Sequence, residues 1–143
     1  MSTAATIHRE IAKLWNERDF NGMRSLAHPN YSYTGGDGKE MTGGPDVGLA
    51  IAQMFANAFP DGKLEVKKVY TDGDVAIAEM VGRGTHKGEL MGIPPTGKPV
   101  EIVICNVMEL RDGKIYRERE YMDMLTMMTQ IGVMKAPGSA AGV

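Results

Sequence analysis

The second half of the chain alternates apolar and polar residues over several long segments, and this period of two constrains the fold more than any other feature. The segments run over residues 64–70, 75–85 and 100–110 and resume at Ile115. Asp72-Gly73 and Asp112-Gly113 lie between neighbouring segments and are typical of tight hairpin turns. The pattern therefore predicts a meander of long antiparallel strands with one face on a core.

The first third of the chain has the period of a helix instead. Apolar residues from Ile7 to Trp15 recur at i, i+4, i+7 and i+8, a second short helix is expected over 21–27, and Pro45 opens a third that ends near residue 60. Residues 31–34 read as a short strand. Helices followed by antiparallel strands and a short last helix predict an α+β fold, in which a curved antiparallel sheet wraps over the helices as a cone with a pocket inside. We expect one domain over residues 1–135 and a flexible tail over 136–143.

Composition narrows the function classes. With 143 residues and a formal net charge of −2, the chain gives no support for a nucleic-acid or membrane partner. A single cysteine, Cys105, excludes an internal disulfide, and the histidines are too scattered for metal ligation. The Gly35–Gly38 loop lacks the lysine of a phosphate-binding loop. We therefore expect no metal and no cofactor, and a cytoplasmic location because we find no signal sequence.

Three stretches carry a resemblance to a known family. They are residues 15–20, the run Gly84-Thr85-His86-Lys87-Gly88 with Gly92-Ile93-Pro94-Pro95-Thr96-Gly97, and residues 111–115, followed by Asp123 with Gln130, Ile131 and Gly132. The chain resembles the SnoaL-like polyketide cyclase (ester cyclase) group of the nuclear transport factor 2-like superfamily. The resemblance implies a cone-shaped α+β barrel, usually a homodimer, with a cofactor-free hydrophobic pocket. It also implies that Asp123 abstracts an acidic C–H proton and starts an intramolecular aldol closure. Two departures concern the site: residues 117–119 replace a frequent Glu-His-Trp, and Thr34 stands where many members have a histidine.

Asp123 lies where the last strand passes into the last helix, and its position fits two roles. Strict alternation places Tyr121, Arg119 and Arg117 on its face of the strand. A carboxylate facing the inside of the cone is suited to proton abstraction, for which burial would raise its pKa. An aspartate at the start of a helix is also an ordinary N-cap, a role that lowers the pKa. The same alternation puts Glu118 and Glu120 on the opposite face, in contact with solvent or with a second subunit.

The other candidate residues also have two interpretations each. His86 is an acid, a base or an orienting partner, or else a plain turn residue. Asn106, alone among apolar residues on its strand face, either ties down a loop or points into the pocket. Met91 lies in the segment 87–99, which is rich in Gly and Pro and is a candidate lid. The predicted site comprises Asp123 and His86 as catalytic residues, with Tyr33, Tyr121, Asn106, Trp15, Tyr31, Arg119 and Met91 contacting the substrate.

Two function classes remain open. One is a small enzyme that performs acid–base chemistry on a hydrophobic, carbonyl-bearing molecule. The other is a non-catalytic protein that uses the same pocket to bind an apolar ligand or a protein partner. In both cases the face of Val103, Cys105 and Val107 is apolar enough to predict a homodimer.

Overall fold

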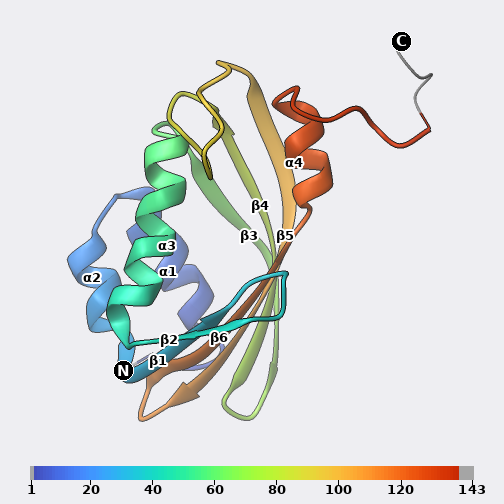
Figure 1. The fold of residues 1–143 in the computed structure, drawn as a ribbon. Coiled ribbons are helices and arrows are strands. Elements are labelled where there is room, and N and C mark those ends of the chain that lie inside the picture. The colour runs from blue at the N-terminus through green and yellow to red at the C-terminus, as the bar shows by residue number, and fades with distance from the viewer. Residues whose placement is uncertain (1, 139–143) are drawn as a thin grey trace.

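The computed structural model describes residues 2–138 and shows three helices against one face of a curled sheet (Figure 1). A fourth helix follows the last strand, beside the end of the sheet. The elements are α1 (Ile7–Asn16), α2 (Phe20–Ser25), β1 (Ala27–Thr34), β2 (Glu40–Thr42), α3 (Pro45–Ala58), β3 (Lys63–Asp72), β4 (Val75–Thr85), β5 (Pro99–Arg111), β6 (Lys114–Met122) and α4 (Met124–Gln130). The predicted α+β class is confirmed.

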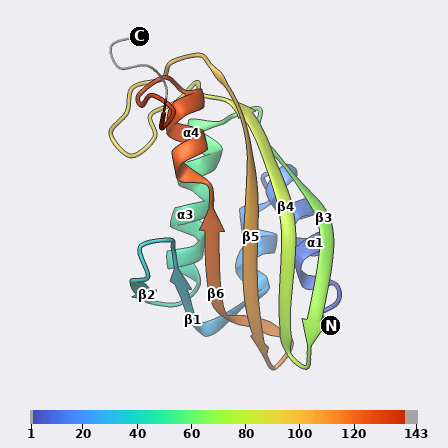
Figure 2. The ribbon, with the colours of Figure 1, turned by 90° about the vertical axis from the view of Figure 1, so that its right-hand side faces the viewer.

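The six strands form one sheet in the order β2-β1-β6-β5-β4-β3. Figure 2 looks onto the strands, with the first three helices behind them. The long meander from β3 to β6 is antiparallel throughout, as the hairpin turns predict. The pairing of β1 with β6 is parallel, so the expectation of a wholly antiparallel sheet is wrong at this place. The sheet is strongly curled but does not close into a barrel, since β2 and β3 remain edge strands.

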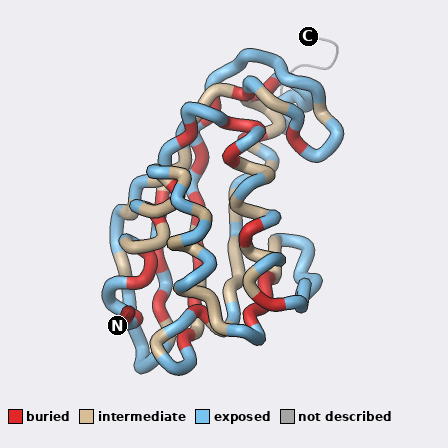
Figure 3. The backbone as a smooth tube through the Cα atoms, turned by 90° about the vertical axis from the view of Figure 1, so that its left-hand side faces the viewer, coloured by how far each residue is buried: buried red, intermediate tan, exposed pale blue. Residues whose placement is uncertain are grey.

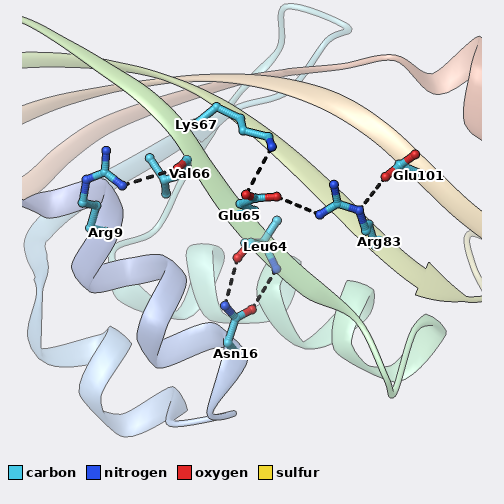
Figure 4. Close-up of polar contacts among 8 residues, drawn as sticks. All are labelled: Arg9, Asn16, Leu64, Glu65, Val66, Lys67, Arg83 and Glu101. Carbon is cyan, nitrogen blue, oxygen red and sulfur yellow. Dashed lines mark hydrogen bonds and ion pairs between the residues drawn. The ribbon is translucent and has the colours of Figure 1, made fainter.

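Hydrogen bonds from the end of α1 and from the turn after it fix this helix to β3 and to the end of α3. The Asn16 carboxamide at the end of α1 donates to the Leu64 carbonyl (2.9 Å) and accepts from the Leu64 amide (2.8 Å), as Figure 4 shows. Arg18, with a φ of 59°, turns its guanidinium back to donate to the carbonyls of Trp15, Phe59, Pro60 and Gly62. Charged hydrogen bonds to carbonyls are stronger than neutral ones, so this residue closes α1 onto the end of α3.

The outer face of β3, β4 and β5 carries a row of charges. Arg83 donates to Glu65 (2.9 Å) and Glu101 (2.5 Å), and Lys67 donates to Glu65 (3.2 Å; Figure 4). These side chains are solvent-exposed, so each pair contributes little stability. The row belongs to the solvent side of the sheet and leaves the inner face to the core.

Buried residues lie where helices and strands face one another (Figure 3). The predicted inner face of β5 is confirmed, because Val100, Ile102, Ile104, Asn106, Met108 and Leu110 are all buried. One core cluster joins the ends of α3 and α4 to β4 and β5, and a second joins α1 to β1 and the start of β6. Between residues 2 and 138, no helix is long and apolar enough to cross a membrane. The predicted tail falls in part on residues 139–143, which lie outside the described residues.

Candidate active site

A cavity of about 150 Å³ lies between the helices and the inner face of the sheet. Its walls are mainly apolar and come from α1, α2, α3 and all strands except β2, with Met127 from α4. Four polar side chains stand out in this lining, namely Tyr31 and Tyr33 of β1 and Glu118 and Glu120 of β6. Apolar cavities with a few convergent polar groups are typical of small-molecule sites, so these four groups are candidates for the chemistry of the cavity.

A bulge in β6 decides which residues of that strand point into the cavity. Near the turn, Leu110 pairs with Ile115, but the next residue of β5, Glu109, pairs with Arg117. The extra residue, Tyr116, changes the face that each later residue presents. Ile115 is buried on the inner side, and beyond the bulge the inner side is taken by Glu118, Glu120 and Met122.

The expectation that Glu118 and Glu120 face solvent or a second subunit is therefore wrong. Both are half-buried, line the cavity and accept two hydrogen bonds each. The Tyr31 hydroxyl donates to Glu118 (2.5 Å), and the Tyr33 hydroxyl donates to Glu120 (2.9 Å). The Asn106 amide donates to both carboxyls, at 2.7 Å to Glu118 and 3.1 Å to Glu120. The two carboxyls thus share one donor.

Burial in this apolar setting raises the pKa of both carboxyls. Desolvation, together with the charge of Glu118, raises the pKa of Glu120 to about 7, against the hydrogen bonds from Tyr33 and Asn106. Desolvation also raises the pKa of Glu118, and its hydrogen bonds from Tyr31 and Asn106 oppose the change. The pKa values of Tyr31 and Tyr33 are raised by burial and by these neighbouring carboxylates, so both phenols keep their protons. When two carboxyls share a site, the charge of one makes ionisation of the other less favourable, so one of them keeps its proton to a higher pH than an isolated carboxyl does.

The amide of Asn106 is fixed by a fifth residue behind it. His8 of α1 lies with its Nε2 atom 2.8 Å from the Asn106 carbonyl oxygen, and both side chains are buried. Because the Asn106 nitrogen donates to two carboxyls, its oxygen must accept, and His8 is then the donor through Nε2–H. Burial lowers the pKa of His8, so the ring is neutral. Asn106 therefore neither ties down a loop nor points into the cavity, which were its two expected roles. It donates to the two carboxyls instead.

Asp123 lies outside the cavity, and the expectation that it faces the interior is wrong. Its side chain is exposed and accepts from the Thr126 amide (3.0 Å) and the Thr126 hydroxyl (2.6 Å) at the start of α4. These hydrogen bonds lower the pKa of Asp123, the direction expected for the N-cap role. An exposed carboxylate with a lowered pKa is a weak base.

His86 is fully buried but takes no part in lining the cavity. Its ring accepts at Nδ1 from the Thr96 amide (3.3 Å) and lies 3.1 Å from the Thr96 hydroxyl, and its backbone bonds to Gly97 and Lys98. It therefore fastens the far end of the loop 87–98 to the residue that follows β4. The contacts of His86 are those of the turn residue that was the alternative interpretation, and its catalytic role stays a prediction.

The structure brings some of the other predicted residues to the cavity and leaves the rest outside. Tyr31, Tyr33 and Trp15 line the cavity, and the Trp15 indole donates to the Ala52 carbonyl (3.1 Å). Tyr121 and Arg119 point from the outer side of β6, where Tyr121 is 51% exposed and Arg119 pairs with Glu109. Met91 is 54% exposed at the tip of its loop, and the loop supplies no lining residue. The bulge accounts for the outer position of Tyr121 and Arg119, and Met91 lies at a left-handed backbone position with φ of 48°.

The glutamate pair is the part of the site that sequence reasoning missed. One signal was present, because Asn106 was the single polar residue on the inner face of β5 and a buried amide needs polar partners. Within residues 2–138, no group of three or more His, Cys, Asp or Glu side chains is arranged to hold a metal ion.

Comparison with known proteins agrees with this fold. Residues 5–131 match the family described as SnoaL-like polyketide cyclase. Aklanonic acid methyl ester cyclase AcmA of Streptomyces galilaeus is 24% identical over 133 residues, which cover 92% of each chain. Nogalonic acid methyl ester cyclase of Streptomyces nogalater is 28% identical over 91 residues, covering 64% of this chain and 68% of that one. Among solved structures, AclR of Streptomyces galilaeus superposes with a TM-score of 0.82 at 23% identity, over 93% of this chain and 83% of that one.

Proposed function

Because the chain belongs to the SnoaL-like polyketide cyclase family, we propose that it cyclises a carbonyl-bearing polyketide ester, with Glu118 and Glu120 exchanging the protons. The observation that carries the proposal is the pair of carboxyls joined by Asn106 in a mainly apolar cavity. With a pKa of about 7, the Glu120 carboxyl is populated in both protonation states near neutral pH. A group with this property serves equally as proton acceptor and proton donor.

The proposed reaction is an intramolecular aldol closure. The ionised carboxyl of the pair removes a proton from a carbon next to a carbonyl, and the C–H electron pair becomes the enolate. The enolate carbon attacks a second carbonyl of the same molecule, forming the C–C bond while the π electrons of that carbonyl move to oxygen. The other carboxyl gives its proton to this oxygen. The product is an isomer of the substrate, so the step needs no oxidant, reductant or cofactor.

The surrounding residues restrict what can donate to the substrate. The Tyr31 and Tyr33 hydroxyls and the Asn106 amide already donate to the carboxyls. The protonated carboxyl is therefore the proton donor best placed to meet a carbonyl oxygen in this part of the cavity. This favours substrates whose C–H proton is already acidic, as between two carbonyls, because the enolate of such a compound needs little further stabilisation.

The test compares two isosteric substitutions, with the methyl esters of aklanonic and nogalonic acid as probe substrates. Glu120→Gln cannot accept a proton, and we expect its turnover to fall by roughly 10²–10⁴-fold. Asp123→Asn preserves an N-cap, since Asn caps about as well as Asp, and we expect turnover within about threefold of the parent.

The reverse result, with activity lost in Asp123→Asn and kept in Glu120→Gln, would restore Asp123 as the base. Tight binding of the esters without turnover by the parent protein would instead favour the non-catalytic binding protein.

A further inference from the structure

His8 and Asn106 have a direct connection to the two carboxyls but do not line the cavity themselves. His8 comes from α1 and is 1% exposed, and Asn106 comes from β5 and is also 1% exposed. A neutral pair so deeply buried contributes no charge to the substrate. Its effect on the chemistry must pass through the carboxyls.

The hydrogen bonds run in one direction only. His8 donates through Nε2–H to the Asn106 oxygen, and the two protons of the Asn106 amide go one to Glu118 and one to Glu120. A donor to the oxygen polarises the amide and strengthens its N–H groups as donors. The His8 donor also excludes the opposite orientation of the Asn106 amide, in which the amide oxygen would face the two carboxyl groups.

The second ring nitrogen of His8 supports this interpretation. Nδ1 is buried and has no hydrogen-bond partner within the described part of the chain. A histidine that served only packing would be replaced at little cost by an apolar residue, since an unpaired buried polar atom is unfavourable. We therefore take the hydrogen-bond donor at Nε2 to be the function of His8 in the site.

We propose that His8 and Asn106 form a positioning pair, which holds Glu118 and Glu120 on one shared donor and keeps both carboxyls oriented for proton exchange. The proposal rests on the proposed function of the two glutamates. It assigns His8 and Asn106 the part of positioning residues, because neither touches the substrate.

The remaining charged groups around the cavity are engaged elsewhere. Arg24 of α2 pairs with Asp46, Arg83 of β4 pairs with Glu65 and Glu101, and Lys63 of β3 donates to the Asn16 carbonyl. The protonation of the two carboxyls is therefore governed first by their burial, and then by the charge of Glu118 on Glu120, by the tyrosine hydroxyls and by the Asn106 amide. A substitution that changes only the Asn106 amide should therefore change the titration of the pair.

The test is a substrate-free titration of the protein labelled with ¹³C at the glutamate carboxyls, followed by NMR. Asn106→Leu removes both shared hydrogen bonds to the ionised forms, and we expect the midpoints of the pair to rise by about one pH unit. His8→Asn is too short to reach the Asn106 oxygen, and we expect a rise of about half that size. His8→Gln places an amide N–H where Nε2 lies, and we expect it to restore the parent midpoints.

Ile131→Val is the control for destabilisation alone, since Ile131 is the C-cap residue of α4 and is buried in the other core cluster, and its titration should match the parent. Unchanged midpoints in both His8→Asn and Asn106→Leu would overturn the positioning role. Equal shifts in His8→Gln and His8→Asn would also overturn it, because the donor would then be irrelevant.

Turnover of the methyl esters separates this proposal from the function on which it rests. We expect the pH dependence of kcat/KM to move with the NMR midpoints in His8→Asn and to return in His8→Gln. If the midpoints shift as expected while Glu120→Gln remains fully active, the positioning is correct and the proposed function fails. A lower kcat at every pH with unshifted midpoints would make His8 a packing residue.

Discussion

Glu120→Gln tests the buried carboxyl through the stability of the protein, without any substrate. Burial and the neighbouring Glu118 raise the pKa of Glu120 from its ordinary value of 4.5 to about 7. A carboxyl whose pKa is higher in the folded state than in the unfolded state binds its proton more tightly when folded. Its contribution to stability is complete below pH 4.5 and is lost as the pH rises to about 7. The parent should therefore become less stable over this window.

The magnitude follows from the two pKa values. Each pKa unit corresponds to about 1.4 kcal/mol, so the change from 4.5 to about 7 costs the parent about 3 kcal/mol at higher pH. Glutamine does not titrate and avoids this cost. It loses one acceptor toward Tyr33 or Asn106, worth about 1 kcal/mol, but that loss is the same at every pH. The useful quantity is thus the change in the stability difference between the two proteins from pH 4.5 to pH 8.

The assay is urea unfolding of both proteins at pH 4.5 and pH 8, at one protein concentration. We expect Glu120→Gln to gain about 3 kcal/mol on the parent between the two pH values, or on the order of 10 °C in Tm. Asp123→Asn is the control of opposite sign, because the pKa of Asp123 is lowered and its contribution is lost as the pH falls. Parallel pH profiles of the free energy of unfolding for the parent and Glu120→Gln would refute the raised pKa of the buried Glu120 carboxyl.

Two further predictions concern packing and assembly. A Cβ on Gly88 would lie 2.0 Å from the Asn57 carbonyl oxygen, so Gly88→Ala should lower the free energy of unfolding in urea by about 3 kcal/mol. A Cβ on Gly36 would have nothing within 4 Å, so the control Gly36→Ala should change it by less than about 0.5 kcal/mol. Equal effects of the two substitutions would contradict the close approach of the loop to α3. We propose that the outer face around Val103, which is 64% exposed, joins two copies of the chain. Light scattering should then give a dimer for the parent and a monomer for Val103→Asp. A monomeric parent at micromolar concentration would contradict this proposal.

Much of the fold follows from local patterns in the sequence. The alternating segments and Asp-Gly turns predict β4 over residues 75–85, and β5 and its inner face to within a residue. Proline at the first position of α3 marks its start. In these segments the hydrophobic period and the turn chemistry point to the same structure.

The elements that escaped prediction depend on partners distant in the sequence. Residues 28–30 read as a break after a helix but belong to β1, because β1 pairs with β6 about 85 residues further along. β2 has three residues, all exposed, and exists through its pairing with β1. Neither pairing leaves a periodic trace in the sequence.

The site was misplaced by a single residue of register. Counting back from the Asp112-Gly113 turn pairs Arg111 with Lys114 and Leu110 with Ile115, and both pairs exist. Continued without a break, this register places Arg119 opposite Asn106 and turns Asp123 inward. The extra residue at Tyr116 instead places Glu120 opposite Asn106.

A bulge of this kind is set by contacts that no strand period records. Tyr116 leaves the ladder with its ring under the Arg111 guanidinium, 3.8 Å from the ring centre, and edge-on to His28 of β1 at 5.3 Å. These partners come from a hairpin turn and from a strand far away in sequence. The bulge turns Glu118 and Glu120 toward the cavity and leaves the arginines that alternate with them, Arg117 and Arg119, on the outer side of the sheet. The acidic character of the site thus depends on one residue that does not pair.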